Sequence, residues 1–253
     1  MTNGMAEGMT EFTVKLAEIP VLIRAIHPEM QRFLQDYLSG EAPAFSIEID
    51  PKDIERERAM SAQSRAAEGL PVIRFREAYL ETLAIYRKLA EELVEHEVLL
   101  FHGSVVAVDG VAYLFTAKSG TGKSTHTRLW REVFGERAVM INDDKPLLRV
   151  SEDGVRAYGT PWNGKHHLGS NLSAPLKALC ILERDSCNHV EAVSAEEAFL
   201  TLLQQCYRPE SGEKMEKTLA LLERMCRRVK LYRLGCNMDP EAALVSYQGM
   251  QEA

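Results

Sequence analysis

The segment from Ala117 to Ser124 constrains this chain more than any other stretch of its sequence. It reads Ala-Lys-Ser-Gly-Thr-Gly-Lys-Ser, follows the apolar run 111–116 and opens a helix-like stretch over 124–133. Glycine lets a backbone turn so that its amides point inward at an anion, and a helix start adds the positive end of its dipole. A strand, a glycine-containing loop and a helix in this order predict a phosphate-binding loop.

The residue types in this loop suit a triphosphate. Lys123 is long enough to reach the outer phosphates, and the Ser124 hydroxyl is a ligand that Mg²⁺ accepts. Ala117 stands where the common motif has glycine. Arg128 and Arg131, farther along the helix, are interpreted as solvated. The predicted nucleotide-binding residues are Ser119, Gly120, Thr121, Gly122, Lys123, Ser124 and Thr125.

Two adjacent carboxylates, Asp143 and Asp144, end the apolar strand-like run 137–142 that follows the helix. One carboxylate at a strand end beside a phosphate loop can hold Mg²⁺, and a second can accept the proton of an attacking hydroxyl. Successive strand residues point to opposite sides, so the two need not share a role. We favour Asp143 as the metal ligand, together with Ser124, and Asp144 as the base, and the reverse assignment stays open.

Two further places carry candidate chemistry. His102 precedes the strands that lead to the loop, and it is either a general acid–base group or a hydrogen-bonded core residue. The segment 159–169 is rich in donors and poor in apolar side chains, which indicates a substrate-holding loop or an ordinary surface loop. Its candidate substrate contacts are Trp162, Asn163, Lys165 and His166.

The order of apolar runs around the loop predicts the sheet. Asp109-Gly110, between the runs 104–108 and 111–115, is a strong signal for a two-residue hairpin. After the helix, the strand 137–142 is followed at once by a run that turns back at 151–154. Antiparallel hairpins on both sides of a phosphate loop are unlike a doubly wound fold, where helices separate parallel strands. We therefore predict an α/β fold with a mixed, largely antiparallel sheet that carries the loop.

The pattern changes near residue 98, which predicts a domain boundary there. Before it, 12–19 alternates like a strand, and the charged segment 50–69 is either a solvated helix or a mobile segment. After it, Ser194-Ala-Glu-Glu predicts a capping box at a helix start. The expected parts are a disordered tail over 1–10, a small N-terminal α/β lobe over 11–97 and a phosphate-loop domain over 98–253.

Composition narrows the class of partner. The 253 residues carry a formal net charge of −7, which argues weakly against nucleic acid or an anionic membrane as the partner. No apolar run approaches the roughly 20 residues that span a bilayer, and 1–10 lacks the pattern of a signal peptide. The five cysteines form no Cys-x-x-Cys pair, so we interpret them as reduced cysteines of a cytoplasmic protein.

His102-Gly103, the hairpin, Ser119-Gly-Thr-Gly-Lys-Ser and the pair Asp143-Asp144 together resemble the catalytic core of bacterial HPr kinase/phosphorylase, over about residues 98–170. The loop is also similar to that of ATP-dependent phosphoenolpyruvate carboxykinase, which shares that fold superfamily. The resemblance implies ATP and Mg²⁺ as cofactors and a homo-oligomer, because relatives form oligomers. Carried over, it implies that His102, Lys123 and Asp144 are catalytic and that Ser124 and Asp143 bind the metal.

Two departures bear on the substrate. Thr125 stands where the HPr enzyme has glutamate, and the segment 160–167 does not follow its pattern, so we expect an acceptor other than HPr. The predicted function is an ATP- and Mg²⁺-dependent kinase acting on a hydroxyl of a peptide, a protein or a small molecule. The alternatives are a nucleotide-binding regulatory module without turnover and a carboxykinase-like lyase, which would need an arginine cluster not evident in the sequence.

Overall fold

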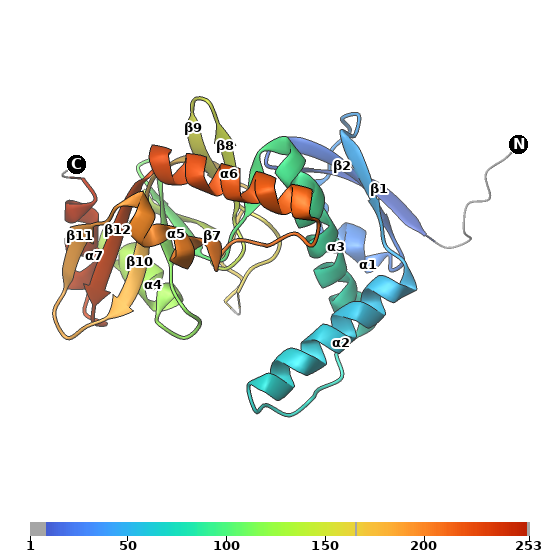
Figure 1. The fold of residues 1–253 in the computed structure, drawn as a ribbon, viewed down its shortest axis with the longest axis horizontal. Coiled ribbons are helices and arrows are strands. Elements are labelled where there is room, and N and C mark those ends of the chain that lie inside the picture. The colour runs from blue at the N-terminus through green and yellow to red at the C-terminus, as the bar shows by residue number, and fades with distance from the viewer. Residues whose placement is uncertain (1–8, 165, 252–253) are drawn as a thin grey trace, which may run out of the picture. The chain divides into compact units, whose positions relative to one another are not determined.

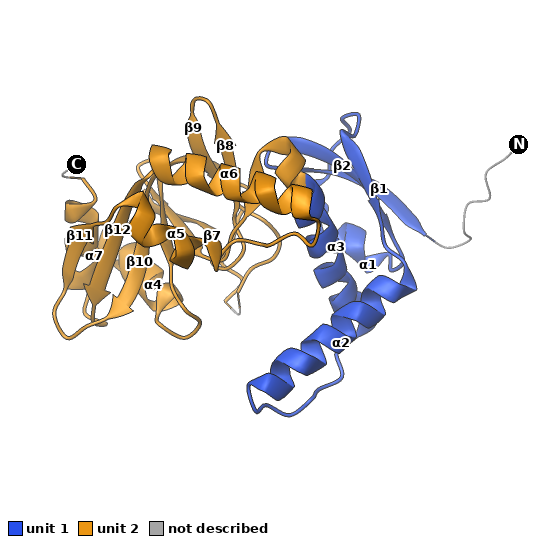
Figure 2. Cartoon of the chain, viewed as in Figure 1, with its two compact units in different colours: residues 1–92 blue, residues 93–253 orange. Residues whose placement is uncertain are grey.

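The computed structural model describes residues 9–164 and 166–251, which fall into two compact units, Met1–Glu92 and Leu93–Ala253 (Figure 2). The division lies a few residues before the expected boundary at 97/98. Most of the expected tail, residues 1–8, lies outside the described part, and the first strand already begins at Thr10.

The elements of both units follow one another along the chain as labelled in Figure 1. The strands are β1 (Thr10–Leu16), β2 (Ile19–Ala25), β3 (Phe45–Glu48), β4 (Val98–Leu100), β5 (Ser104–Val108), β6 (Val111–Thr116), β7 (Ala138–Asn142), β8 (Leu147–Ser151), β9 (Gly154–Tyr158), β10 (Ser173–Arg184), β11 (His189–Ala192) and β12 (Lys230–Cys236). The helices are α1 (Glu29–Phe33), α2 (Pro51–Ala67), α3 (Glu77–Leu93), α4 (Lys123–Phe134), α5 (Ala195–Leu203), α6 (Gly212–Arg228) and α7 (Glu241–Gly249), with short 3-10 helices η1 (Gln35–Tyr37), η2 (Val94–His96) and η3 (Gly135–Arg137).

The first unit is a small α/β lobe. Its sheet has the order β1-β2-β3, with β1 and β2 antiparallel and β2 and β3 parallel. Ala17 and Glu18, both with positive φ, form the turn between β1 and β2, so the predicted strand 12–19 ends before them. The charged segment 50–69 contains the helix α2, which Asp50 and Asp53 start with a capping box. The helical interpretation of this segment is therefore confirmed.

The second unit is built on a mixed sheet. The order β4-β8-β9-β10-β6-β5-β7 is extended by β12, which pairs with β10, and by β11, which pairs with β12. Among the described residues, β10 runs parallel to both β6 and β12, and its other pairing and the remaining pairings of this sheet are antiparallel. The prediction of a mixed, mostly antiparallel sheet in an α/β fold is confirmed.

Both faces of the central strands are buried, which explains their nearly continuous apolar sequence. On β6, Tyr113 and Phe115 face a core that includes Trp130 of α4 and the α7 alanines. Ala112 and Leu114, which alternate with them, face the core on the other side, together with residues of α5 and α6. The sheet therefore lies between α4 and α7 on one face and α5 and α6 on the other.

Local sequence signals fix a hairpin and a helix start in the second unit. Asp109 and Gly110 both have positive φ, as the hairpin between β5 and β6 requires. The Ser194 hydroxyl accepts a hydrogen bond from the Glu197 amide, and the Ser194 amide donates to the Glu197 carboxylate. The predicted capping box is therefore confirmed. The second strand of the hairpin, β6, leads directly into the 117–122 loop, and α4 begins where the loop ends.

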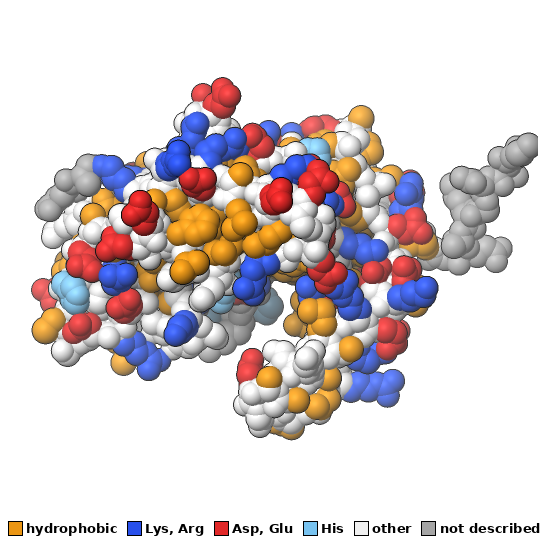
Figure 3. Space-filling view, in the orientation of Figure 1, with side chains coloured by type: hydrophobic (Ala, Val, Ile, Leu, Met, Phe, Trp, Pro, Cys, Tyr) orange, Lys and Arg blue, Asp and Glu red, His pale blue; other side chains and the backbone are white. Residues whose placement is uncertain are grey.

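Surface composition is mixed. Figure 3 shows basic and acidic side chains interspersed over the visible face, with hydrophobic side chains gathered over α5 and α6. Leu200 of α5 is 70% exposed. Within residues 9–164 and 166–251, no helix combines the length and the apolar character that crossing a membrane requires.

Candidate functional site

The 117–122 loop leaves the N-terminus of α4 open. Gly120 and Gly122 have φ of 80° and 128°, which glycine adopts readily and other residues do not. The first helical hydrogen bond runs from the His126 amide to the Gly122 carbonyl, so the amides before it have no acceptor within the helix. The helix has no side-chain cap and no acidic residue in its first turn. Ala117 has no positive φ, so the glycine of the common motif is not required at that position.

Two cationic side chains hold the loop in shape. Lys123 Nζ donates to the Ala117 carbonyl at 3.1 Å and so closes the loop on itself. Arg184, at the end of β10, donates from Nη2 to the Gly120 carbonyl at 2.5 Å and from Nε to the Thr121 carbonyl at 3.2 Å. Because their carbonyls are held by Arg184, both peptide groups have a fixed orientation. A side chain of β10, the strand parallel to β6, therefore fixes the conformation of the loop.

Asn142, fully buried at the end of β7, shapes the turn that carries the two aspartates. Its Oδ1 accepts from the Asp144 amide at 2.9 Å and from the Lys145 amide at 2.6 Å, which ends the strand. Its Nδ2 donates to the Thr160 carbonyl at 3.1 Å. One asparagine side chain thus ties the aspartate turn to the 159–169 segment.

Asp143 is 5% exposed, and its two oxygens differ. Oδ1 accepts from the Gly164 amide at 2.6 Å. Oδ2 is buried without a hydrogen-bond partner among the described residues. A Cβ on Gly164 would lie 3.1 Å from this oxygen, so glycine permits the close approach. A buried carboxylate oxygen without a donor is costly unless a cation or a proton joins it.

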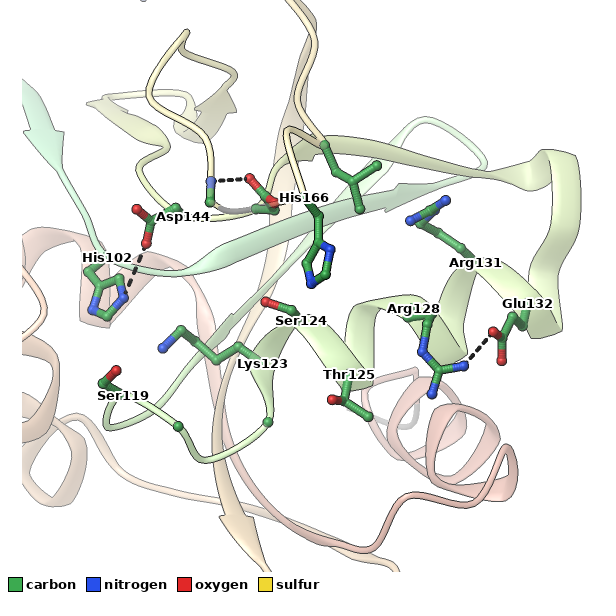
Figure 4. A pocket seen from close by; sticks show the side chains of 15 residues that line it. His102, Ser119, Lys123, Ser124, Thr125, Arg128, Arg131, Glu132, Asp144 and His166 are labelled. Atoms are coloured by element: carbon green, nitrogen blue, oxygen red, sulfur yellow. Dashed lines mark hydrogen bonds and ion pairs between the residues drawn. The ribbon is translucent and has the colours of Figure 1, made fainter. Parts of the chain in front are cut away.

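Asp144 faces His102, and the two residues form a polar pair at the end of the site away from the α4 arginines (Figure 4). His102 Nε2 lies 3.3 Å from Asp144 Oδ1, and His102 Nδ1 lies 3.0 Å from Gln205 Oε1. The His102 amide also donates to the Gln205 carbonyl at 2.8 Å. His102 is therefore oriented by Gln205 on one side and directed at the Asp144 carboxylate on the other.

Charge and burial act together on two groups. Burial of the Asp144 carboxyl disfavours its charged form, but contact with His102 and the nearby lysines outweigh this, so the pKa of Asp144 is lower than usual. Burial lowers the pKa of Lys123, and Lys145 adds to this effect, whereas Asp144 opposes it. Asp144 is consequently a carboxylate at neutral pH.

A single cavity of about 1100 Å³ in the second unit joins these groups. Its lining contains the loop, the outer face of α4, both aspartates and part of the 159–169 segment (Figure 4). The residues are His102, Ser119, Gly120, Gly122, Lys123, Ser124, Thr125, Arg128, Arg131, Glu132, Asp143, Asp144, Gly164, His166 and Leu168.

The predicted residues meet here with some exceptions. Thr121 does not line the cavity and instead accepts from Arg184. Trp162 and Asn163, expected to contact substrate, do not line it either: Trp162 is 8% exposed, and Asn163 Oδ1 accepts from a buried side-chain amide at 3.2 Å. These two side chains support the segment rather than the cavity. Lys165 lies outside the described residues, and His166 lines the cavity.

The two arginines of α4 line the cavity as well, which the sequence did not indicate. Arg128 is exposed, as expected of a solvated side chain, whereas Arg131 is half-buried. The helical period places both in the lining, because positions four and seven residues after Ser124 return to the same face of α4. The sequence places them on that face, but it does not show which segment covers it.

The donor set fits a hydrated Mg²⁺ bound together with phosphates. Asp143 Oδ2 has no partner within residues 9–164 and 166–251, and the Ser124 hydroxyl is exposed to the same cavity. Mg²⁺ prefers such oxygen ligands. Within the described part of the chain, no group of three or more His, Cys, Asp or Glu could hold a metal alone. A site with one carboxylate and a hydroxyl therefore depends on phosphate oxygens and water for its remaining ligands.

Sequence reasoning missed three residues that order the site: Arg184, Asn142 and Gln205. Arg184 and Gln205 come from distant parts of the chain, and only the parallel pairing of β10 with β6 brings Arg184 to the loop. Asn142 carried a readable signal, since asparagine directly after an apolar run favours a side-chain-capped turn.

Comparisons with known proteins give little further information. No protein-family model matches the chain, and no curated protein matches it. Among solved structures, the Hpr(Ser) kinase/phosphatase from Coxiella burnetii matches with a TM-score of 0.35 and 7% identity, covering 60% of this chain and 97% of that one. A similarity this low supports no statement about activity.

Proposed function

We propose that this chain is an ATP- and Mg²⁺-dependent kinase that transfers the γ-phosphoryl group to a hydroxyl of a peptide, protein or small molecule. One observation carries the proposal. A single cavity combines an open helix N-terminus and Lys123 with the Asp143 carboxylate, whose Oδ2 has no partner among the described residues, and with the Asp144–His102 pair. The first two features suit an anion, and the carboxylates suit a metal and a proton.

The polyphosphate would lie on the open amides of the loop and α4, with Lys123 against its outer phosphates. Lys123 would exchange its internal bond to the Ala117 carbonyl for these oxygens. Ser124 and Asp143 would hold Mg²⁺, which when bound supplies positive charge to the phosphate oxygens. Positioning and charge stabilisation together would provide most of the rate.

Asp144 would take the proton of the acceptor hydroxyl. Its lowered pKa keeps it ionised, and no described residue hydrogen-bonds its Oδ2, so that oxygen is available as the acceptor. The hydroxyl oxygen forms a bond to the γ-phosphorus, the bond from that phosphorus to the bridging oxygen breaks, and ADP leaves. His102 would keep the carboxylate oriented through Oδ1.

An ATP-dependent mass-shift screen tests the proposal. Hydroxyl-bearing peptides and metabolites are incubated with Mg·ATP and the protein, and an added phosphoryl group is detected by mass. Asp144→Asn should bind ATP but transfer about 10²- to 10⁴-fold more slowly, as expected for loss of a general base. Undiminished transfer by this variant would show that Asp144 is not the base. ATP binding without any transfer would instead favour a regulatory module.

A further inference from the structure

The cavity continues past the loop along α4, and the proposed kinase activity does not use this part. Arg128, Arg131 and Glu132 line it, and their spacing places them on one face of the helix with Ser124. With a rise of 1.5 Å per residue, Arg131 lies roughly 10 Å along the helix axis from Ser124. Figure 4 shows these three side chains well away from His102 and Asp144.

This far end has a different chemistry from the loop. Arg128 is neutralised by Glu132, with Nη1 and Oε1 2.5 Å apart. Arg131 is half-buried, and its guanidinium has no hydrogen-bonding or charged partner among the described residues. The 159–169 segment adds an imidazole, His166, and an aliphatic side chain, Leu168, to the lining of the same cavity. The far end therefore offers one planar cation without an opposite charge of its own, in a cavity whose lining includes an imidazole and an aliphatic side chain.

The positions of the other groups restrict what can bind there. An acceptor hydroxyl has to reach Asp144 within hydrogen-bond distance, so the acceptor belongs to the opposite end. The phosphates belong to the loop in the middle. The cavity, at about 1100 Å³, is larger than the ~300–1000 Å³ that one drug-sized ligand usually fills. What remains for the far end is the nucleoside of the bound nucleotide.

We propose that Arg131, with His166 and Leu168, forms the base-binding end of the site, where the guanidinium stacks on the purine ring of a nucleoside triphosphate. Guanidinium groups stack on aromatic planes, and a lysine at the same place cannot do so. This inference rests on the proposed function, because it needs a nucleotide on the loop. It adds that the nucleoside contributes binding energy independently of the phosphates.

Calorimetry with two probes separates these contributions. Mg·ATP carries both a nucleoside and phosphates, whereas inorganic triphosphate with Mg²⁺ carries phosphates alone. Arg131→Ala should weaken Mg·ATP binding by about 2- to 30-fold, which is the range of cation–π contacts. It should leave the affinity for triphosphate unchanged. Arg131→Lys should recover only part of this loss, because an ammonium keeps the attraction of a cation to the ring but lacks the plane that stacks on it.

The matched control is Arg156→Ala, an exposed arginine of β9 that does not line the cavity and should bind both probes as the wild type does. Equal weakening of ATP and triphosphate in Arg131→Ala would show a phosphate contact and overturn the inference. Unchanged binding of both probes, or full rescue by lysine, would overturn it as well. A wild-type protein that binds neither probe refutes the proposed function itself, a result distinct from these.

Discussion

His126 is expected to make the stability of the second unit depend on pH. It lies on α4, is 2% exposed, and its Nε2 is 3.1 Å from Trp130 Nε1. Indole nitrogen only donates, so Nε2 accepts, and the neutral ring carries its proton on Nδ1. Nδ1 itself is buried without a partner among the described residues. A second proton would face that indole donor, and burial lowers the pKa of His126 to about 4.

The size of the effect follows from linkage. Histidine titrates near 6.5 in an unfolded chain. The difference between this pKa and that of the folded state gives the free energy by which folding favours the neutral ring. This contribution is fully present above pH 6.5 and is lost as pH falls from 6.5 toward 4. Between pH 7 and pH 5 the free energy of unfolding should fall by about 2 kcal/mol through His126 alone. That is a large share of the roughly 5–15 kcal/mol typical of a domain.

The assay is urea unfolding at the two pH values, followed by tryptophan fluorescence, because both tryptophans lie in the second unit. His126→Phe removes the titration, keeps a ring against Phe115 and leaves Trp130 its other acceptor, Ser246 Oγ at 2.9 Å. The wild type should lose about 2 kcal/mol more than this variant over the interval. A control, His189→Gln at an exposed position, should behave as the wild type. Equal losses in the wild type and His126→Phe would show that His126 does not cause the pH dependence.

Three further predictions concern the loop, the 159–169 segment and the start of α5. In steady-state kinetics, Arg184→Gln should raise the KM for ATP about tenfold, because the loop loses two hydrogen-bond donors. Arg184→Lys should recover part of this loss, and an unchanged KM in Arg184→Gln would show that Arg184 does not hold the loop. Gly159→Ala should lower stability in thermal unfolding by at least about 2 kcal/mol, since its Cβ would overlap the Ser170 carbonyl oxygen, and a wild-type Tm would contradict this. Ser194→Ala should lower the free energy of unfolding by about 1 kcal/mol, because α5 loses its N-terminal cap. Ser194→Asp keeps a capping oxygen and should leave the free energy of unfolding unchanged.

Much of the fold was predictable where local chemistry decides it. Asp109-Gly110 marks its hairpin because both positions adopt positive φ. The turn at Ala17 and Glu18 has the same backbone without glycine or asparagine, so β2 was missed. Its conformation is set by the pairing of β1 with β2 and not by turn residues. Short-range signals thus fail where tertiary pairing imposes a conformation that the residues do not favour.

The candidate site was predictable as a set of chemical groups but not as a shape. The loop and both aspartates were found from their sequence context, because strand ends beside a glycine-containing loop converge. The inward packing of Trp162 and the cavity-facing position of Arg131 depend on how the 159–169 segment folds back over α4. That arrangement rests on Asn142 and on the close approach at Gly164, which no periodicity reveals.

Binding of nucleotide phosphates by the 117–124 segment can be measured by calorimetry with Mg·ATP. The wild type should bind with measurable heat, and Lys123→Ala should lose at least about tenfold in affinity, as expected when a charged donor is removed. Lys118→Ala, an exposed lysine of the same loop that does not line the cavity, should bind as the wild type does. No heat from the wild type, or equal affinities for the wild type and Lys123→Ala, would contradict the account.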